Sequence, residues 1–339
     1  MTADSLPATR GTAAFERRVA RALEAVVAKD APLLVACSGG PDSTAALIAI
    51  SRSRGPDDGA VVAAHFNHEL RPAAATALDG AAVDAVAALL GRRVLHGAAA
   101  DVGGLAGGSE AAAREARYGW LAEACAESGA RHCATGHTLD DQAETVLLRL
   151  TRGAGTAGAA AMSAAARWPV PCEGPELQVL RPLLGVRRQE THDYLDTLGV
   201  ESRLDATNEL VAFDRNRVRH RVLPELRAIN PRAEEALARF AALARDDDEA
   251  LEAWAAREAV EIAVVEAGVA LVQRRALLNL PRAVSSRLLR RAAADVGLTL
   301  DGEQVVQLLR IARRRGARLS LAGGEAVVGE GELRIVRWP

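Results

Sequence analysis

The feature that most constrains this chain is a glycine-rich turn at 38–43, between an apolar run at 33–37 and a helical pattern at 42–53. This order predicts a strand, a tight turn and a helix. The turn directs backbone N–H groups and the positive end of a helix dipole at one point, which suits a phosphate group. Two adjacent glycines let the backbone approach an anion without a Cβ in the way. We therefore predict a nucleotide phosphate site formed by Ser38, Gly39, Gly40, Pro41, Asp42 and Ser43.

Asp42 is unusual at such a site, because a carboxylate repels phosphate. Its presence is explained if it holds a divalent metal that the phosphates share, and Mg²⁺ is the metal we expect. The turn lacks the lysine and the longer spacing of the GxxxxGK[ST] loop. It resembles instead the PP-loop, SGGxDS, of the N-type ATP pyrophosphatases, which split ATP between its α and β phosphates. An ordinary strand-to-helix connection is the alternative interpretation.

Short apolar runs alternate with helical patterns after the turn, and this alternation predicts the fold. Continuous apolar runs are typical of strands buried on both faces of a sheet. We therefore predict an α/β fold with a doubly wound parallel sheet, whose ligands bind outside the carboxyl ends of the strands. An amphipathic helix is expected within 1–30. The expected strands are 33–37, 61–66, 92–96 and 132–135, and the expected helices are 42–53, 75–90, 109–128, 139–151 and 187–199, with a loop at 152–176.

Length and charge divide the chain into parts. Its 339 residues are enough for two domains and a connector. We expect a PP-loop ATP-binding catalytic domain at 1–230, a charged helical connector at 231–266 and a small α+β domain at 267–339. The last part holds 13 arginines against six acidic residues, a net charge of +7, whereas the whole chain carries −2. A basic module on an acidic body suggests a polyanionic partner for the module.

The remaining composition indicates the cellular compartment of the protein more than its function. Arginine replaces lysine throughout, which reflects genomic base composition and does not by itself indicate nucleic-acid binding. Four cysteines show no CxxC spacing and are expected to be buried thiols in a reducing compartment. The first ten residues lack the apolar core of a signal peptide, and no apolar stretch approaches a membrane span. We expect a cytoplasmic protein with no membrane partner.

Two segments add candidate ligands near the nucleotide. His65 and His68 stand in the sequence HFNHELR after the second expected strand, and their spacing without further ligands makes a zinc site improbable. We expect a loop that faces the nucleotide or substrate, with His65 at ATP and His68 and Arg71 at RNA. Arg114 and Arg117 lie three apart on a helix that follows Ser109, and such a pair can bind phosphate or carboxylate. A surface i,i+4 pair of Glu110 and Arg114 is the structural alternative.

The second strong motif is GHTLDDQAET at 136–145, directly after the strand expected at 132–135. Thr138 and Asp141 have capping-box spacing, so part of the acidity is structural. Three acids in five positions exceed what a cap needs. Asp140 and Glu144 share a helix face at i,i+4, where like charges repel unless a cation binds, either Mg²⁺ or an ammonium group. His137, in the same motif, is expected at ATP.

A last cluster combines DATN at 205–208 with DRNRVRHR at 214–221. Arginines at alternate positions would share one face of a strand or spread around a helix. A solvated run of charge is the alternative, but interleaved asparagine and arginine suggest contacts to an RNA backbone or base. The residues we expect to contact RNA in this cluster are Asp205, Asn208, Arg215, Asn216, Arg217 and Arg219.

Taken in order, these blocks resemble the tRNA(Ile)-lysidine synthases. The matching blocks are SGGPDS, HFNHELR, EAAAREARY, ATGHTLDDQAET, VLRPLLGVRRQE, DATN and DRNRVRHRVLPEL, over roughly 33–232, with a further similarity at 277–291. The resemblance implies that ATP adenylates the C2 oxygen of the wobble cytidine in a tRNA(Ile) with a CAU anticodon. Free L-lysine then displaces AMP to give lysidine. Many members carry a second C-terminal module, which this chain lacks on our interpretation.

The resemblance also distributes roles among the candidate residues. Asp42 and Asp141 are expected to hold Mg²⁺, and Asp140 and Glu144 to bind the lysine ammonium, with Asp140 as first choice. Asp141 is assigned to helix capping or metal. Arg114 and Arg117 are expected to steady the nucleotide or the activated oxygen. A homodimer is one expected arrangement of the chain.

Other functions compete with this assignment. A PP-loop enzyme of tRNA 2-thiolation would need cysteines to carry sulfur or an iron–sulfur cluster, and the chain has no CxxC. The basic C-terminal part and the 214–221 cluster argue against synthesis of GMP or NAD. A non-catalytic RNA- or nucleotide-binding relative is the alternative from another class, against which the intact Ser38, Asp42 and Ser43 argue.

Overall fold

The computed structural model describes residues 5–55, 57–67, 73–99, 110–172, 174–203 and 214–338. It forms two compact units, Met1–Ala241 and Ala242–Pro339. The boundary lies inside one long helix, α10 (Ala233–Ile262). His68, Arg71, Asp205 and Asn208, four of the residues expected to contact RNA, lie outside the described residues.

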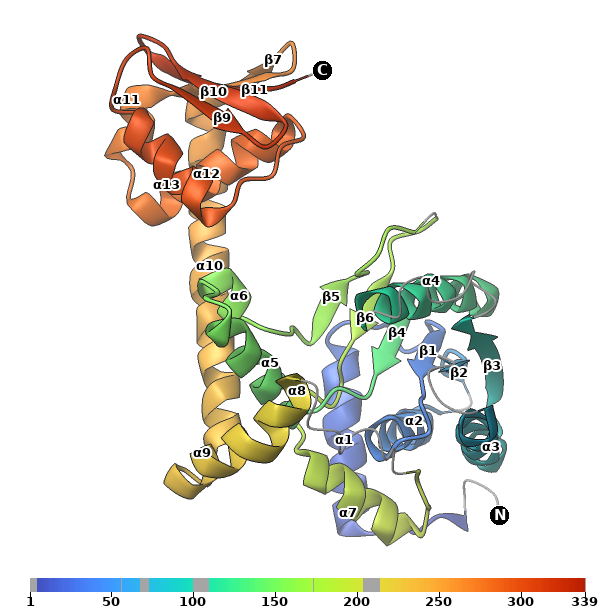
Figure 1. The fold of residues 1–339 in the computed structure, drawn as a ribbon. Helices are drawn as coiled ribbons and strands as arrows, with labels where there is room; N and C mark the ends of the chain where they lie inside the picture. Colours follow the sequence, from blue (N-terminus) through green and yellow to red (C-terminus); the bar gives the residue numbers. More distant parts are fainter. Residues whose placement is uncertain are drawn as a thin grey trace. The chain divides into compact units, whose positions relative to one another are not determined.

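The first unit is built on a six-stranded sheet in the order β3-β2-β1-β4-β6-β5 (Figure 1). Its neighbours pair in parallel except for β5, which runs antiparallel to β6. Leu33 pairs with Val61 on one side and His132 on the other, so the first strand is central. The predicted α/β parallel sheet is therefore confirmed. The strands are β1 (Leu33–Ala36), β2 (Val61–Asn67), β3 (Arg93–Ala98), β4 (His132–Thr135), β5 (Ala165–Arg167) and β6 (Gln178–Leu180).

Helices cover both faces of this sheet, as double winding requires. Leu33 and Val35 face a core shared with α1, α2, α3 and α7, whereas Leu34 faces a core shared with α4. Successive residues of β1 thus bury on opposite faces, which explains why the strand is apolar throughout. The helices are α1 (Arg10–Glu24), α2 (Pro41–Ser53), α3 (Ala73–Leu89), α4 (Glu110–Ser128) and α7 (Arg188–Leu198).

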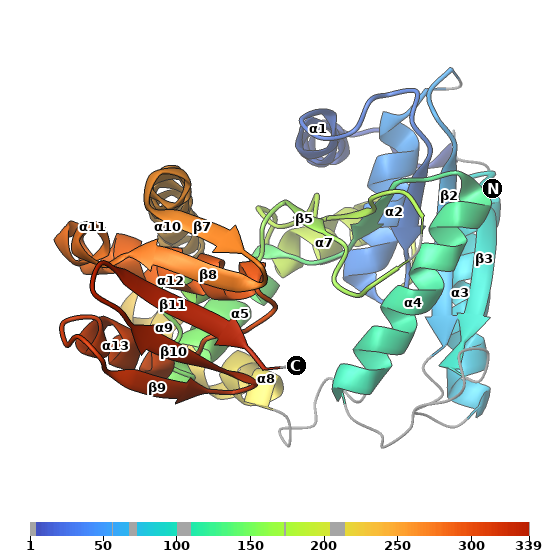
Figure 2. The same ribbon diagram turned by 90° about the horizontal axis from the view of Figure 1, so that it is seen from above.

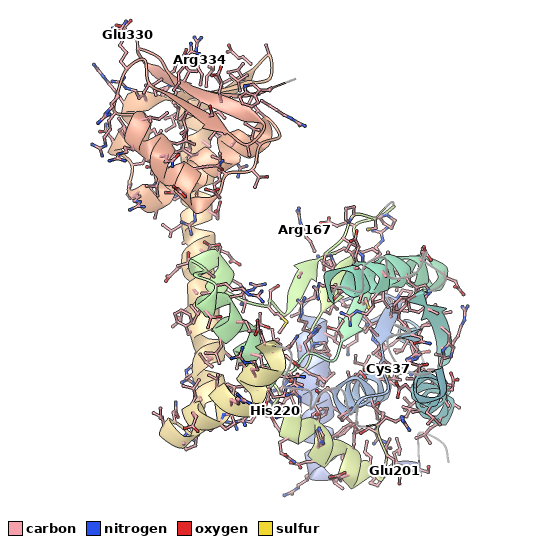
Figure 3. The ribbon with its side chains drawn as sticks, viewed as in Figure 1. Cys37, Arg167, Glu201, His220, Glu330 and Arg334 are labelled. Atoms are coloured by element: carbon pink, nitrogen blue, oxygen red, sulfur yellow. The ribbon has the colours of Figure 1, made fainter. Side chains whose placement is uncertain are left out.

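A smaller helical group follows and carries much of the charge discussed below. It consists of α5 (Leu139–Thr151), α8 (Asp214–Arg217), a π-helical turn η4 (Val218–Val222) and α9 (Leu223–Ile229). Ala143, Val218 and Leu223 form its buried core. The segment α8–η4 packs beside α5, and His220 marks it in Figure 3.

The stretch 152–176, expected to be a loop because it is rich in Gly, Ala and Pro, contains two short elements of regular secondary structure. Residues Thr156–Ala159 form the one-turn helix α6, and β5 lies within the same stretch. Trp168 explains why this stretch is ordered: its indole N–H donates to the Tyr118 carbonyl, and the two rings meet edge to face. Arg167, on β5, extends into solvent (Figure 3).

The second unit has a five-stranded antiparallel sheet in the order β7-β8-β11-β10-β9 (Figure 2). The helical pattern expected to reach 266 ends at Ile262, because Ala263–Glu266 pair as β7. The last part of the chain, 318–337, forms three of these strands. The elements are β7, β8 (Val269–Gln273), α11 (Arg274–Asn279), α12 (Arg282–Asp295), α13 (Gly302–Ile311), β9 (Arg318–Leu321), β10 (Gly324–Val328) and β11 (Glu332–Arg337).

Among the described residues, the helices are all too short or too polar to cross a lipid bilayer.

Candidate active site at the carboxyl ends of the parallel strands

The glycine-rich turn connects the end of β1 to the start of α2. Gly40 precedes the helix and has no side chain to cap it, so the N–H groups of the first turn face outward. The Ser43 hydroxyl donates to the Gly40 carbonyl (3.0 Å) and accepts from the Ser38 N–H (3.1 Å), which fixes the shape of the turn. Ser38 is exposed and Ser43 is buried. Ser43 therefore shapes the turn from inside, and the hydroxyl of the exposed residue Ser38 lies 3.1 Å from Ser43 Oγ.

Gly39 is required by its backbone conformation. Its φ of +86° lies in the left-handed region, and a Cβ there would stand 3.1 Å from the Asp79 carbonyl oxygen of α3. The Gly39 carbonyl accepts from the Arg203 N–H (3.1 Å), and the Arg203 side chain donates to Asp79 (2.9 Å). The turn is thus held between α3 and the segment that precedes the 204–213 stretch.

A second glycine brings the acidic motif close to this turn. A Cβ on Gly136 would lie 2.7 Å from the Ser43 backbone nitrogen, which no real side chain tolerates. Gly136 lies between β4 and α5, so its missing side chain lets the start of α5 approach the start of α2. The sequence GHTLDDQAET therefore begins with glycine for a packing reason.

Two side chains from the start of α7 form hydrogen bonds with Asp42. Arg188 Nε donates to Asp42 Oδ2 (3.1 Å), and the Thr191 hydroxyl contacts Asp42 Oδ1 (2.5 Å). Burial raises the pKa of Asp42 above its usual value, while the charge of Arg188 and the Thr191 hydroxyl oppose that rise. Among the described residues, Asp42 is thus paired with a guanidinium and a hydroxyl of the chain itself.

The acid cluster consists of Asp140, Asp141 and Glu144 at the start of α5, and each member is bound differently. Asp140 Oδ2 accepts the Arg188 backbone N–H (2.8 Å) and so caps α7. Asp141 Oδ2 accepts from the Thr138 N–H and hydroxyl (both 2.8 Å), which confirms the predicted capping spacing. Glu144 is fully buried.

Guanidinium groups neutralise this cluster. Asp141 Oδ1 accepts from Arg188 and Arg215, each at 2.9 Å. Burial alone would raise the pKa of Asp141, but these two arginines outweigh it and lower that pKa to about 2. Glu144 accepts from Arg215 Nε and Arg219 Nε, both at 2.7 Å. The repulsion expected between Asp140 and Glu144 is therefore relieved by cations that the chain supplies.

The alternate arginines of 214–221 lie on a helix, which sorts them onto two faces. Arg215 and Arg219 are four apart and both reach Glu144. Arg217 faces away, with its side chain 60% exposed and its carboxylate partner Asp214 at 3.4 Å. Asn216 is buried. Of these residues expected at RNA, the structure brings Arg215 and Arg219 to the acid cluster and leaves Arg217 at the surface.

The two histidines expected at ATP both lie near strand ends, where His65 is buried and His137 is half-buried. His65 Nδ1 lies 3.0 Å from the Cys37 carbonyl, which can only accept, so Nδ1 carries the proton. His137 Nδ1 lies 2.7 Å from the Thr135 hydroxyl, and burial lowers the pKa of His137 to about 3. Each imidazole is held by the last residues of a strand, and His137 adds no positive charge near neutral pH.

Arg114 and Arg117 converge on one aromatic ring. Their guanidinium carbons lie 4.8 and 5.1 Å from the centroid of the fully buried Tyr118 ring, within cation–π range. Both stand in the first half of α4, and helices of a parallel sheet begin at its carboxyl edge. The structure brings neither of them into hydrogen-bond contact with the acid cluster.

Sequence reasoning missed α7 as part of the site. Arg188 contacts Asp42, Asp141 and Glu144, and Thr191 contacts Asp42. The block VLRPLLGVRRQE carried the resemblance, but it offered no spacing that distinguishes Arg188 from Arg187, which pairs with Glu235. Gly185 and Val186 could have indicated a tight turn before α7. Such a turn brings the start of α7 back toward the ends of the strands, and this would have placed Arg188 near the site.

Comparison with known proteins agrees with this geometry. A family model described as the PP-loop domain matches residues 12–226. A tRNA(Ile)-lysidine synthase of Thermobifida fusca is 40% identical over 82% of this chain and 82% of its own length. The protein of that name from Streptomyces coelicolor is 37% identical over 91% of this chain and 86% of its own length. The one from Geobacter sulfurreducens is 40% identical over 85% of this chain but 61% of its own length.

A solved structure supports the fold alone. The U34-tRNA thiolase NcsA of Methanococcus maripaludis, described with its [4Fe-4S] cluster, superposes with a TM-score of 0.55 at 16% identity, over 69% of this chain and 80% of its own. The matched PP-loop model and the extended similarity to three named relatives lead to one conclusion: the chain belongs to the PP-loop family and, within it, to the tRNA(Ile)-lysidine synthases.

Proposed function

We propose that this protein uses ATP to join L-lysine to C2 of the wobble cytidine of a tRNA(Ile) with a CAU anticodon, giving lysidine, AMP and pyrophosphate. The observation that carries the proposal is that Arg188 contacts both Asp42 and Asp141. The phosphate turn and the acid cluster therefore share one site, as a reaction that activates an oxygen with ATP and then replaces it by an amine requires. The names of the relatives supply the substrates.

The first step transfers AMP to the cytidine. The C2 oxygen attacks the α-phosphorus of ATP, a new O–P bond forms, the bond to the β-phosphate oxygen breaks, and pyrophosphate leaves. The open N–H groups of the first turn of α2 would bind the phosphates and stabilise charge on the departing pyrophosphate. Ser38 adds a hydroxyl, and Arg114 and Arg117 would steady the nucleotide from α4.

The second step uses the acid cluster. The lysine ε-ammonium would bind Asp140 and Glu144, with Asp140 as first choice, and must lose a proton before its nitrogen bonds to C2. The C2–O bond then breaks and AMP departs. The neutral His137 beside this cluster would act as a hydrogen-bonding group toward the nucleotide, since it carries no charge at neutral pH.

Mg²⁺ fits the donor chemistry of Asp42 and Asp141. Magnesium prefers one or two carboxylates together with substrate phosphates, and both carboxylates face the same cation, Arg188. When bound, Mg²⁺ would neutralise charge on the phosphates of ATP. The described residues contain no group of three or more metal-ligating side chains, so the phosphates would complete the coordination.

The rest of the chain has a proposed place in this scheme. We assign residues 1–230 to catalysis, 231–266 to the connector and the arginine-rich 267–339 to the tRNA. His68, Arg71, Asp205 and Asn208 keep their proposed RNA contacts, together with Arg215, Asn216, Arg217 and Arg219. A tRNA substrate puts the reaction in the cytoplasm. A homodimer stays a prediction.

The decisive experiment is mass spectrometry of the anticodon loop after incubation of tRNA with the protein, ATP and lysine. The expected product is a cytidine enlarged by lysine with loss of water, accompanied by one AMP. Asp42→Ala should abolish AMP formation. Asp193→Ala, an exposed acid on the same helix as Arg188, is the matched control and should retain it.

The same assay separates the alternatives. A thiolating enzyme would add sulfur to the RNA and leave lysine unused, and a non-catalytic relative would show no exchange between ATP and pyrophosphate. Near-normal AMP formation by the Asp42 variant would contradict the PP-loop assignment.

A further inference from the structure

The N-terminal helix α1 packs against the two helices that bring Asp42 and its partners together (Figure 1). Asp42 stands in the first turn of α2, and Arg188 and Thr191, which bind it, stand on α7. Thr191 is fully buried, so its hydroxyl reaches Asp42 only while α7 keeps its orientation and its distance from α2. The position of α7 relative to α2 therefore decides how Asp42 is held.

Glu16 of α1 connects α2 to α7 through one carboxylate oxygen. Arg52 Nε, from the last turn of α2, lies 2.7 Å from Glu16 Oε1. The Tyr194 hydroxyl of α7 donates to the same oxygen (2.9 Å). The side chains of Glu16 and Arg52 are each only 15% exposed, and Tyr194 is buried. Water therefore screens this junction less than it screens a surface ion pair, and contacts to the charged oxygen hold firmly.

Tyr194 is oriented by its ring as well as by its hydroxyl. The ring stacks on Phe15 of α1, with centroids 4.3 Å apart and planes 13° from parallel. Burial and the neighbouring Glu16 carboxylate raise the pKa of the Tyr194 phenol, so it keeps its proton and acts as the donor. A rotation of α7 about its axis would break the stack and the hydrogen bond together.

A second attachment holds the start of α7. Arg18 of α1 pairs with Glu190 and donates through Nη2 to the Gly185 carbonyl (2.8 Å). The other oxygen of Glu190 accepts the Arg187 N–H (2.9 Å) and so caps α7. The Arg18 and Glu190 side chains are 45% and 39% exposed, so this ion pair is weaker than the junction at Glu16.

The two attachments flank Thr191 along α7. Glu190 precedes Thr191 directly, and Tyr194 follows it three residues later. On a helix, Glu190 and Tyr194 share one face, whereas Arg188 and Thr191 share the adjacent one. One face of α7 is therefore held by α1 while the adjacent face contacts Asp42.

We propose that Glu16 and Tyr194 are positioning residues for ATP: through α7 they hold the Thr191 hydroxyl against Asp42 at the glycine-rich turn. The inference rests on the proposed function, because it takes ATP as the substrate whose phosphates meet Asp42. Glu16 and Tyr194 act only through α7, since their contacts join α1, α2 and α7 and leave the bound nucleotide to the residues at the strand ends.

The test measures the dissociation constant of a non-hydrolysable ATP analogue, in the presence of Mg²⁺, by isothermal titration calorimetry of the full chain. This constant depends on the geometry of the site, whereas misfolded protein lowers only the measured stoichiometry. Tyr194→Phe removes the hydroxyl and keeps the ring on Phe15. It should weaken binding of the analogue about three- to tenfold, which is the contribution of one hydrogen bond. An unchanged dissociation constant would overturn the inference.

Two substitutions at Glu16 separate its acceptor oxygen from its charge. Glu16→Ala removes the acceptor and should weaken binding of the analogue as much as Tyr194→Phe does. Glu16→Gln keeps an oxygen that accepts the Tyr194 hydroxyl and should stay within about twofold of wild type. If Glu16→Gln were as damaging as Glu16→Ala, the charge beside Arg52 would matter and the role of Tyr194 would be wrong. Glu127→Gln, the matched control, breaks an exposed ion pair with Arg93 and should leave the constant unchanged.

A double-mutant cycle asks whether Tyr194 acts through Thr191. Thr191→Val removes the hydroxyl that reaches Asp42 and nearly keeps the volume of the side chain. In the Thr191→Val background, Tyr194→Phe should change the dissociation constant by less than about twofold, because the contact that it supports is already absent. An equal loss of affinity in both backgrounds would show that the two residues act independently, and would overturn the inference.

The wild-type titration keeps the two proposals apart. Wild-type binding of the analogue, together with equal binding by Tyr194→Phe, would remove the inference and leave the proposed function standing. Absence of binding by the wild-type protein would remove the use of ATP, and the inference with it.

Discussion

Arg188 Nε donates to Asp42 Oδ2 at 3.1 Å, although 146 residues separate the two along the chain. This contact joins the first turn of α7 to the phosphate turn, and the other end of the same guanidinium reaches Asp141 at 2.9 Å. One side chain therefore sets the spacing between the glycine-rich turn and the acid cluster. Burial alone would lower the pKa of Arg188, but four neighbouring carboxylates outweigh it and raise that pKa, so Arg188 stays charged at every accessible pH.

Replacing Arg188 should damage both halves at once. In Arg188→Ala, Asp42 and Asp141 lose their shared cation, which costs about 3 kcal/mol of folding free energy. The pKa of Asp42 rises further, because its main charge-lowering partner is gone. We expect kcat/KM to fall at least about 100-fold, and the acid limb of the pH–rate profile to move to higher pH. The measurements are urea unfolding and AMP formation from pH 5 to 8.

Arg188→Lys serves as the conservative comparison for that variant. A lysine keeps the charge but cannot bridge two carboxylates with a planar fork, so it should restore the position of the acid limb more than it restores kcat. An acid limb that stays in place in Arg188→Ala would show that Arg188 does not tune Asp42.

Gly136→Ala tests whether the close packing of α5 against the glycine-rich turn is needed for stability and for ATP binding. The new Cβ would lie 2.7 Å from the Ser43 backbone nitrogen, and backbone atoms cannot yield as a flexible side chain can. We expect a loss of about 1–3 kcal/mol in stability and a larger KM for ATP, because the phosphate turn is pushed away from α5. Thermal unfolding and ATP–pyrophosphate exchange measure the two effects.

Gly119→Ala is the matched control for Gly136. Gly119 lies within α4 with open space at the Cβ position, so alanine should stabilise that helix by about 0.5–1 kcal/mol. Equal behaviour of the two variants would contradict the close approach of Gly136 to the phosphate turn.

The lowered pKa of His137 predicts that the folding stability of the protein decreases in acid. Its pKa is about 3 in the folded protein, because it is buried, and near 6.5 in the unfolded chain. Between these values the unfolded state binds a proton that the folded state does not, so stability falls as the pH drops below 6.5. The loss reaches about 2 kcal/mol at pH 5.

The corresponding variant is His137→Asn. The difference in unfolding free energy between wild type and variant should shrink or change sign as the pH falls from 7 to 5, measured by urea unfolding. Asp141 does not interfere, since its contribution is lost only below its unfolded value near 3.8. If the difference in unfolding free energy between wild type and His137→Asn does not depend on pH, the His137 side chain is exposed to solvent and the prediction is wrong.

The sequence predicted the parts of the site that are local and missed the parts that are assembled by the fold. The phosphate turn, the capping role of Asp141 and the parallel sheet each follow from spacing within a few residues, and each is found. Arg188 and Thr191 could not be found that way, because their contacts with Asp42 depend on where α7 returns to the sheet.

The charges on α5 show the same limit. Their repulsion led us to expect Mg²⁺ or an ammonium group at the acids, whereas the described structure places guanidinium groups of the chain there. A helix places Arg215 and Arg219 on one face toward Glu144, whereas a strand would have aligned all four alternate arginines. The sequence left both conformations open, and the burial of Val218 and Leu223 against Ala143 of α5 favours the helix.

Asp140→Asn should distinguish the amine half from the nucleotide half. Asparagine keeps an oxygen that can accept the Arg188 N–H, so the cap on α7 survives, but it removes the charge that Arg227 approaches at 3.4 Å. If Asp140 binds the lysine ammonium, the loss of one charge-assisted contact should raise KM for lysine about tenfold and leave KM for ATP within about twofold. Steady-state AMP formation at varied lysine and at varied ATP measures both constants. Asp193→Asn, an exposed acid on α7, is the control and should change neither. A rise confined to KM for ATP would assign Asp140 to the nucleotide instead, and equal rises in both constants would mean that the cap on α7 had been lost.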